Sequence, residues 1–294
     1  DKIKSLVDKI GDYNKAGFDR AIAVKPKKNE KEIYGILPRE RSKPYDMKEI
    51  IYRLVDNSIF EEYKENYGKS IICGYSRIDG WAVGIVANQR EIIKTKKGEV
   101  QFGGVIYSDS ADKSARFIAN CNQKKIPLVF LQDVTGFMVG SKSEHAGIIK
   151  DGAKMVNTMS NSVVPKFTII IGNSYGAGNY AMCGKAYDPR LIVAWPTAKL
   201  GVMGGEQAAK VLLQIEKSKL EANGERIDTN KEKSILNNIK EKYEIETSPY
   251  YAASRLWVDN IIDPLETREI ISIGIEAANH SPIKERYNPG VIQT

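Results

Sequence analysis

The chain has 294 residues, of which 42% are hydrophobic and 28% charged, and its formal net charge is +7. This length holds one large or two small α/β domains with a substantial core, and the composition is ordinary for a globular protein. The lysines are scattered along the chain, which argues against a nucleic-acid-binding protein. No CxxC pair occurs among the three cysteines, and no apolar run approaches the ~20 residues of a membrane helix, so a reducing, cytoplasmic location is expected.

Residues 1–40 are predicted to lie outside the main domain. A short helix from about Ile3 to Tyr13 precedes a mixed Lys/Pro/Glu stretch ending at Leu37-Pro38, which is typical of a linker. The sequence given does not start with Met, so we expect a fragment or a processed product. A further helix is expected after Asp46, a candidate N-cap.

A β-hairpin is the clearest local prediction. Asp79-Gly80 separates two apolar, β-branched segments at 70–75 and 81–86, and this dipeptide fits a tight hairpin turn. The polar, lysine-rich segment from Asn88 to Gln101 that follows is expected to be an exposed loop.

Strands and helices alternate through the rest of the chain. The expected elements are helices at 110–124, 141–159, 250–256 and 265–278, strands at 127–131, 165–171, 191–195 and 258–263, and a charged helical excursion at 214–246 broken at Asn223-Gly224. Ser141 and Glu144 have capping-box spacing, and their helix is expected to bury Ala146, Ile149, Ala153, Val156 and Met159. This order predicts an α/β fold whose turns gather along one edge of a sheet.

The strand at 165–171 runs into a glycine-rich segment, Gly172 to Gly178, predicted to be a tight turn with a helix opening near Gly176. No side chain there is a good nucleophile or base, but free N–H groups at a helix N-terminus suit a carbonyl oxygen that becomes negative during reaction. A second glycine turn, around Gly136, follows the strand at 127–131. Two such turns would form an oxyanion hole if they met. The simpler interpretation is that the glycines only permit close packing of strand and helix.

Other kinds of site find little support in the sequence. Gly172 to Gly176 has GxSxG spacing around Ser174, yet His280 is the only histidine downstream of it, so a serine hydrolase is not expected. Rossmann and P-loop glycine patterns are absent. Asp133, Asp188 and Asp263 each end a predicted strand and are interpreted as turn caps, so no metal site is predicted.

Several separate motifs, in the same order, resemble the carboxyltransferase (β) subunits of biotin-dependent acyl-CoA carboxylases. They are Phe130–Gly140, Lys150–Met155, Gly172–Tyr187, Ala194–Pro196, Val202–Ala209 and Arg255–Pro264. The resemblance covers about residues 38–290, and the wording of Ser174–Tyr180 followed by Met182–Gly184 is most similar to the methylcrotonyl-CoA and geranyl-CoA branch.

This resemblance implies an α/β, crotonase-like (ClpP/crotonase) spiral of ββα units. Residues 1–40 would be the linker or tail of a missing N-terminal carboxyltransferase domain, and residues 41–294 the C-terminal carboxyltransferase domain. By the same resemblance, the N–H groups of Ala177 and Gly178 hold the ureido oxygen of carboxybiotin. Its carboxyl group leaves as CO2 and is captured by an acyl-CoA enolate. The biotin and substrate cleft would be lined by Thr135, Gly136, Phe137, Tyr175 and Gly176.

The resemblance also implies partners. Biotin would be carried on a biotin carboxylase or carrier subunit. The acyl-CoA would be held by the N-terminal domain of a neighbouring subunit in a dimer-based homo-oligomer, expected to be a hexamer, in the cytoplasm or the mitochondrial matrix. No metal, nucleic acid or membrane partner is expected. The acyl group stays open between methylcrotonyl-like and propionyl-like. A decarboxylase or transcarboxylase subunit and a non-catalytic assembly module stay open too, and this chain alone is expected to fold without turnover.

Overall fold

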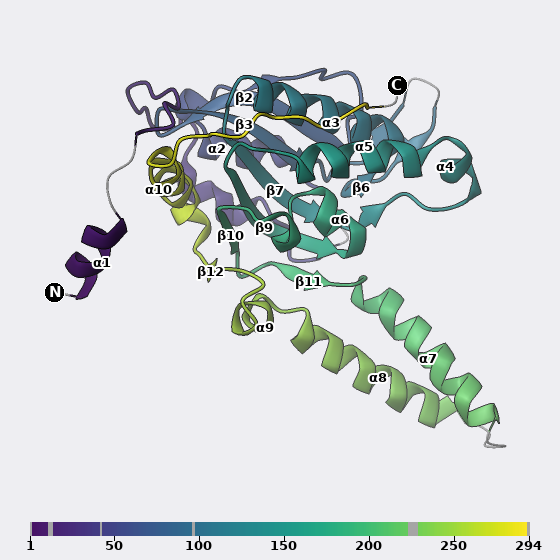
Figure 1. The fold of residues 1–294 in the computed structure, drawn as a ribbon. Coiled ribbons are helices and arrows are strands. Elements are labelled where there is room, and N and C mark those ends of the chain that lie inside the picture. Colours follow the sequence, from purple (N-terminus) through teal and green to yellow (C-terminus); the bar gives the residue numbers. More distant parts are fainter. Residues whose placement is uncertain (1, 11–13, 42, 96–97, 223–228, 293–294) are drawn as a thin grey trace.

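The structure is a computed structural model that describes residues 2–10, 14–41, 43–95, 98–222 and 229–292 (Figure 1). Its centre is a sheet of eight strands in the order β1-β2-β3-β7-β9-β10-β12, with β11 paired to β9. The strands are β1 Glu61–Glu62, β2 Ile71–Ile78, β3 Trp81–Asn88, β7 Leu128–Val134, β9 Lys166–Tyr175, β10 Leu191–Ala194, β11 Lys199–Gly201 and β12 Asn260–Ile261. From β3 to β12 all neighbouring strands are parallel. The expected α/β architecture is confirmed.

Helices connect these strands, and short strand pairs lie beside the sheet. The helices are α1 Lys2–Ile10, α2 Met47–Leu54, α3 Ser108–Gln123, α4 Ser141–His145, α5 Ile148–Ser160, α6 Gly176–Ala181, α7 Gly205–Ala222, α8 Thr229–Glu246, α9 Pro249–Ser254 and α10 Thr267–Asn279, with 3-10 turns η1 Glu30–Gly35, η2 Asp56–Ser58, η3 Lys185–Tyr187 and η4 Pro264–Glu266. The pairs are β4 Ile93–Lys94 with β5 Val100–Gln101, and β6 Val105–Ile106 with β8 Gly136–Phe137.

The sheet separates two hydrophobic cores because side chains alternate between its faces. In β7, Leu128 and Phe130 pack with apolar side chains of α3 and α5. Val129 and Leu131 point the other way and pack with α2 and α10. The result is a three-layer arrangement, helix–sheet–helix, in which the carboxyl ends of the parallel strands open on one edge (Figure 1).

Local sequence signals predict most of these elements. β2 and β3 form the expected antiparallel hairpin, with Ile78 opposite Trp81 and both Asp79 (φ 52°) and Gly80 (φ 82°) in the left-handed region that a tight primed turn requires. Asp46 caps α2, its carboxylate accepting the Lys48 N–H at 2.9 Å. The charged excursion is also confirmed: α7 and α8 form a helical arm that projects from the body (Figure 1). The break predicted at Asn223-Gly224 and the end of the first predicted helix, at Tyr13, lie outside the described residues.

Predictions for two segments between elements need correction. In the segment from Asn88 to Gln101, Asn88, Gln89 and Arg90 are buried instead of exposed, whereas most described residues from Glu91 onward are exposed as predicted and include the short β4–β5 hairpin. The strand at 165–171 does not end in a turn at Gly172, since β9 continues to Tyr175 before α6 begins. In both places polar residues or glycines belong to ordered backbone, because side chains of neighbouring segments form hydrogen bonds with backbone N–H groups there.

The predicted helix at 141–159 is in fact two helices. Gly140, not Ser141, is the N-cap of α4, and the chain breaks at Gly147 (φ 94°) before α5 starts. This break resets the helical phase, so Met155 and Met159 face the core while Ile149 is 74% exposed. The predicted inward positions at Ala146 and Ala153 are likewise exposed, and Val156 is half-buried.

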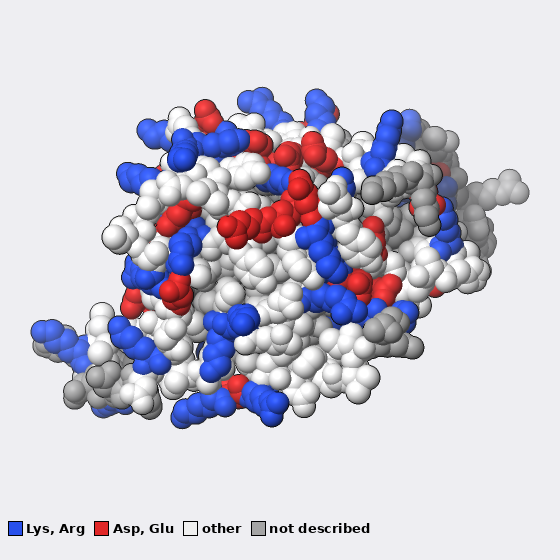
Figure 2. Space-filling model, turned by 90° about the horizontal axis from the view of Figure 1, so that it is seen from above, with Lys and Arg blue, Asp and Glu red and all other residues white. Residues whose placement is uncertain are grey.

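Basic and acidic side chains are interspersed over the face shown in Figure 2. Many form exposed ion pairs, such as Lys142 with Glu99 at 2.7 Å. The basic excess therefore does not form a continuous stripe on that face.

Candidate active site

The start of α6 presents two backbone N–H groups. The first residues of a helix have no acceptor inside the helix. Among the described residues, none accepts a hydrogen bond from the backbone N–H of Ala177 or Gly178. Ala177 is exposed and Gly178 is buried. The two donors therefore lie at the boundary between solvent and core.

The second glycine turn packs directly against this helix start. A Cβ atom added to Gly178 would lie 2.6 Å from Val134 Cγ2 and 3.1 Å from Gly136 Cα. Real Cβ atoms essentially never come as close as 2.6 Å to another heavy atom, so a side chain at position 178 requires Val134 or the turn to shift. The expected meeting of the two turns takes place because β7 and β9 are adjacent parallel strands whose carboxyl ends share one edge.

The side chains predicted to line the cleft differ in where they point. Thr135 is exposed, and both its N–H and its Oγ1 donate to the carbonyl oxygen of Gly104, at 2.8 and 3.1 Å. The ring of Phe137 packs against Gly152 of α5, on the core side. Tyr175 is buried too, and its burial raises the pKa of the phenol to about 12. Of the five predicted residues, Thr135 is therefore exposed, Gly136, Phe137 and Gly176 are half-buried, and Tyr175 is buried.

Ser174 is not placed as a nucleophile. Its side chain is buried, and its hydroxyl donates to Gln132 Oε1 at 2.7 Å and accepts from Asn179 Nδ2 at 2.7 Å. Gln132 in turn donates to the carbonyl oxygen of Met182 at 2.6 Å. These bonds tie α6 to β7 and β9. His280 lies instead beside Glu276, a neighbour on α10, so the geometry gives no support to a serine hydrolase.

A buried charged group lies beneath the two turns. The carboxylate of Asp133 is 3.2 Å from Arg90 Nε, and it accepts hydrogen bonds from the Tyr45 hydroxyl at 2.9 Å and the Asn173 N–H at 2.8 Å. Burial, reinforced by the charge of Asp133, raises the pKa of Tyr45 well above its usual value. The interpretation of Asp133 as a turn cap is thus wrong.

A signal for this pair exists in the sequence. The polar run from Asn88 to Arg90 begins at the last residue of β3, and Asp133 is the second-last residue of β7, which pairs with β3. Polar residues at the ends of neighbouring parallel strands meet at one edge. Of the other two aspartates, Asp263 does cap a turn, accepting the Leu265 N–H at 2.9 Å, and Asp188 adopts a left-handed conformation.

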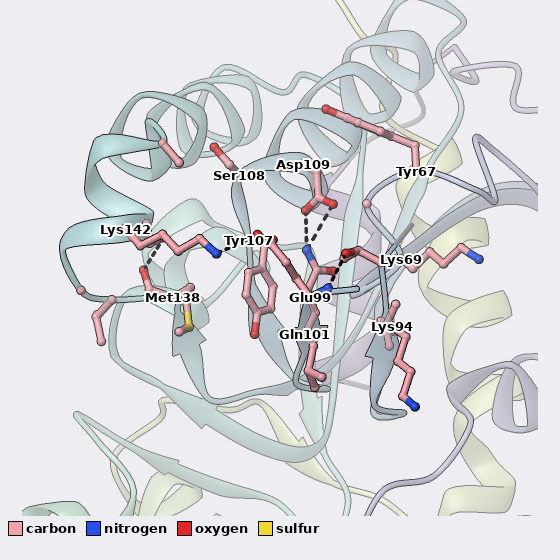
Figure 3. Close-up of a pocket in the computed structure, with 18 of the residues that line it drawn as sticks. Tyr67, Lys69, Lys94, Glu99, Gln101, Tyr107, Ser108, Asp109, Met138 and Lys142 are labelled. Carbon is pink, nitrogen blue, oxygen red and sulfur yellow. Dashed lines mark hydrogen bonds and ion pairs between the residues drawn. The ribbon is translucent and has the colours of Figure 1, made fainter. Parts of the chain in front are cut away.

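A cavity of about 890 Å³ opens beside the second turn (Figure 3). It lies between the β4–β5 hairpin, the start of α3 and the segment Met138–Ala146, which begins one residue after Phe137. Tyr107 and Met138 line it, and Lys69, Lys94 and Lys142 lie around it. Ala177 and Gly178 are not part of its lining. Within the described ranges there is no group of three or more His, Cys, Asp or Glu side chains arranged to hold a metal ion.

Comparison with known families decides what kind of domain carries these turns. The pattern of the carboxyl transferase domain matches residues 1–290. The chain belongs to this family. It is 42% identical over 283 residues to the biotin-dependent 3-methylcrotonyl-coenzyme A carboxylase beta1 subunit of Mycobacterium tuberculosis, covering 96% of this chain and 51% of that protein. It is 46% identical over 252 residues to the mitochondrial methylcrotonoyl-CoA carboxylase beta chain of Dictyostelium discoideum, covering 86% and 40% respectively.

Solved carboxyltransferase structures share the fold. The geranyl-CoA carboxylase β subunit of P. aeruginosa superposes with a TM-score of 0.79 at 34% identity, over 96% of this chain and 51% of that one. Transcarboxylase 12S gives a TM-score of 0.78 at 32% identity, over 94% and 51%. The crotonase-like fold and the resemblance to methylcrotonyl-type β subunits are therefore confirmed.

The comparisons also set the scale of the match. The chain spans about half the length of the curated relatives it matches. In the part of the chain that the structure describes, no helix is both long and apolar enough to cross a bilayer.

Proposed function

We propose that this chain is the biotin-facing half of the carboxyltransferase component of a biotin-dependent acyl-CoA carboxylase. The observation that carries the proposal is the pair of N–H groups at Ala177 and Gly178, held without acceptors against the Gly136 turn. Two such donors stabilise a carbonyl oxygen on which negative charge grows, without any side-chain acid or base. Carboxybiotin, when bound, supplies the carboxyl group. This chain orients the ring oxygen and shields it on the side of Val134.

The residues present fit such a ligand. A pair of backbone donors without an acceptor in the chain fits the oxygen of a cyclic urea, whose ring is neutral although the carboxyl group on its nitrogen carries a negative charge. The cavity beside Met138 and Tyr107 is lined neither by the turn residues 135–137 nor by residues 175–178, so the proposal rests on the donors and not on this cavity. The backbone of Thr135, Gly136, Phe137, Tyr175 and Gly176 is proposed to frame the cleft at these donors.

The remaining assignments follow from the relatives and stay proposals for this chain. We place residues 41–294 in the C-terminal carboxyltransferase domain and residues 1–40 in the connection to an N-terminal one. The prediction that all of residues 1–40 lie outside the main domain is wrong, because Phe18 and Ile33 pack in the core of that domain. The N-terminal domain of a neighbouring subunit would hold the acyl-CoA. The carrier of biotin would be a separate biotin carboxylase or carrier subunit, and the oligomer a hexamer built from dimers, in the cytoplasm or the mitochondrial matrix. A methylcrotonyl-like acyl group is favoured, because methylcrotonyl-type relatives reach 42–46% identity.

A second reading uses the same site for a different net reaction. The 12S subunit of methylmalonyl-CoA carboxyltransferase from Propionibacterium freudenreichii and the methylmalonyl-CoA decarboxylase α subunit of Propionigenium modestum are each 35% identical to this chain. A propionyl-like acyl group and transfer in the reverse direction would then apply. Assaying carboxylation of methylcrotonyl-CoA and propionyl-CoA, and decarboxylation of the corresponding carboxylated thioesters, with the complete subunit separates these readings.

The proposal is tested with Gly178→Ala in the complete subunit assembled with its biotin carrier. The added methyl group collides with Val134 and moves the donors, and losing one such donor lowers kcat by about 10²–10³-fold. Gly35→Ala is the matched control, since nothing lies within 4 Å of the added Cβ, and it should leave carboxyl transfer unchanged. Full transfer activity in Gly178→Ala would reduce the chain to an assembly module. Turnover by the isolated chain would contradict the half-site model.

A further inference from the structure

The two strands that carry the turns do not run in register to their ends. β7 and β9 pair regularly from Leu128 opposite Lys166 to Gln132 opposite Ile170, and next Val134 pairs with Ser174. One residue of β7, Asp133, therefore spans three residues of β9. Such a bulge leaves backbone groups of the longer strand without a partner in the ladder.

Side chains take over these backbone groups. The Thr197 hydroxyl donates to the Ile171 carbonyl oxygen at 2.6 Å, and Asp133 Oδ1 accepts the Asn173 N–H at 2.8 Å. A Cβ atom on Gly172 would lie 2.4 Å from Asp133 Cγ, so the carboxylate rests directly on this glycine. Asp133 thus fixes the bulge at Asn173, which lies three residues before Gly176, where α6 begins.

The other oxygen of Asp133 leads to the second turn. Asp133 Oδ2 faces Arg90, whose guanidinium donates to the Gly103 carbonyl oxygen at 3.2 Å and to the Arg41 carbonyl oxygen at 3.1 Å. The next residue, Gly104, accepts both donors of Thr135. One carboxylate therefore connects the segment that carries Thr135 and Gly136 with the segment that carries Ala177 and Gly178.

The pair is too deeply buried to be an incidental surface contact. Asp133 is 5% exposed and Arg90 8% exposed. The hydroxyl of Tyr45, in the segment just before α2, donates a further hydrogen bond to the Asp133 carboxylate. A buried ion pair of this kind contributes little net stability compared with apolar residues, but separating its partners leaves an uncompensated buried charge and is strongly destabilising. That property suits a device that fixes a geometry.

We propose that Asp133 is a positioning residue for carboxyl transfer. Its carboxylate, held by Arg90 and Tyr45, sets the separation between the Thr135–Gly136 turn and the amides of Ala177 and Gly178. Asp133 does not touch the reacting atoms. The inference rests on the proposed function and assigns to it a residue outside the turns themselves.

The experiment compares Asp133→Asn with Asp56→Asn in the complete subunit with its biotin carrier. Asp56 is also a buried carboxylate that accepts backbone N–H groups and pairs with an arginine, but its partners are Val24, the hairpin turn of Asp79 and Gly80, and Arg268 of α10. Because a misplacement of about 1 Å costs up to ~10²-fold in rate, Asp133→Asn should lower kcat at least about tenfold while KM for the acyl-CoA changes less than about twofold. Asp56→Asn should leave kcat unchanged.

Amide hydrogen exchange supplies a readout that is independent of turnover. In Asp133→Asn, exchange should accelerate at Asn173 and Thr135, whereas Asp56→Asn should accelerate it at Asp79 and Gly80. Tyr45→Phe keeps the ring and removes one hydrogen bond to the carboxylate, so an intermediate loss of kcat is expected, and this variant carries the test if Asp133→Asn does not fold.

Two outcomes separate the inference from the proposed function. If Gly178→Ala is inactive while Asp133→Asn and Tyr45→Phe keep the parent kcat, the positioning role is wrong and the proposed function stands. If Gly178→Ala is fully active, the proposed function itself fails. An equal fall of kcat in Asp56→Asn would also overturn the inference, since any buried carboxylate would then have the same effect.

Discussion

Asp133 and Asp56 are buried aspartates at opposite ends of the parallel strands, and they use their carboxylates differently. Asp56 accepts three backbone N–H groups, from Val24, Asp79 and Gly80, and pairs with Arg268 at 2.6 Å. Asp133 accepts a single backbone N–H and devotes its second oxygen to side chains. The first lies where β3 begins and the second where β7 ends.

The difference shows how one kind of group serves two purposes. At the amino end, Asp56 binds the N-terminal segment, the hairpin turn and α10 at once, which stabilises the packing of these three segments against one another. At the carboxyl end, Asp133 reaches two segments, one of which carries the N–H groups of Ala177 and Gly178, for which the described residues supply no acceptor. Loss of the first should therefore be felt in stability and loss of the second in activity.

The largest expected effect on stability is that of Asp56→Ala. It leaves three backbone N–H groups and the Arg268 guanidinium without their acceptor, and breaking one side of a buried ion pair costs about 3–5 kcal/mol. Denaturant unfolding followed by tryptophan fluorescence measures the change in the free energy of unfolding. A loss below about 1 kcal/mol, the value of an exposed ion pair, would show that Asp56 does not stabilise the fold as a buried ion pair does.

Ser174→Ala should have a smaller effect, at the carboxyl end. Gln132 Oε1 and Asn179 Nδ2 lose their shared partner in a buried site, which costs about 1–3 kcal/mol. The change appears in thermal or denaturant unfolding, with Ser160→Ala, whose hydroxyl is bonded at the exposed end of α5, as the control. Ester hydrolysis by the parent protein that vanishes in Ser174→Ala would reinstate the hydrolase interpretation.

Arg20→Ala should act more weakly and only at the amino end. Arg20 stacks on the buried Trp81 at 4.6 Å and pairs with Asp79 and Glu276, which are partly exposed, and such contacts together are worth about 1 kcal/mol. Hydrogen exchange at Ala21 and Ala82, whose N–H groups bond across this contact, should accelerate. A change in carboxyl transfer would show that the two ends of the sheet are coupled.

The smallest expected effect is on stability at acid pH, through the titration of Asp79. The Ser272 hydroxyl, followed by Arg20 and Arg268, holds the pKa of Asp79 below its usual value of about 4. The resulting stability is fully present above about pH 4 and is lost as the pH falls through the lowered pKa of the folded state. Ser272→Ala should return the pKa of Asp79 toward its usual value, as measured by carboxyl carbon NMR. An unchanged titration would mean that the hydroxyl is not the main cause.

Local rules account for what the sequence predicted well. The Asp79-Gly80 turn, the Asp46 cap and the alternation of strands and helices depend on neighbours along the chain. The meeting of the Gly136 and Gly178 turns was predictable as well, since both follow strands of one parallel sheet. The roles assigned to Ala177 and Gly178 remain predictions, supported by their unpaired N–H groups.

The predictions that failed concern residues whose partners are distant in sequence or whose burial depends on where a helix begins. Burial of Arg90 follows from its pairing with Asp133, which is visible only once β3 and β7 are known to be adjacent. The bulge that extends β9 through Gly172 depends on that same carboxylate. Ile149 was assigned to the wrong face because a left-handed Gly147 restarts the helix, and apolar spacing alone does not reveal where a helix begins.

The donors at the start of α6 belong to the main chain, and this decides which genetic experiments can find them. An alanine scan leaves residue 177 as it is, and no side-chain truncation anywhere removes a peptide N–H. Such a scan would report Asp133 and Gln132 as important and pass over the groups they support. Replacing the amide of residue 177 or 178 by an ester, through chemical ligation, deletes the donor alone and so addresses it directly.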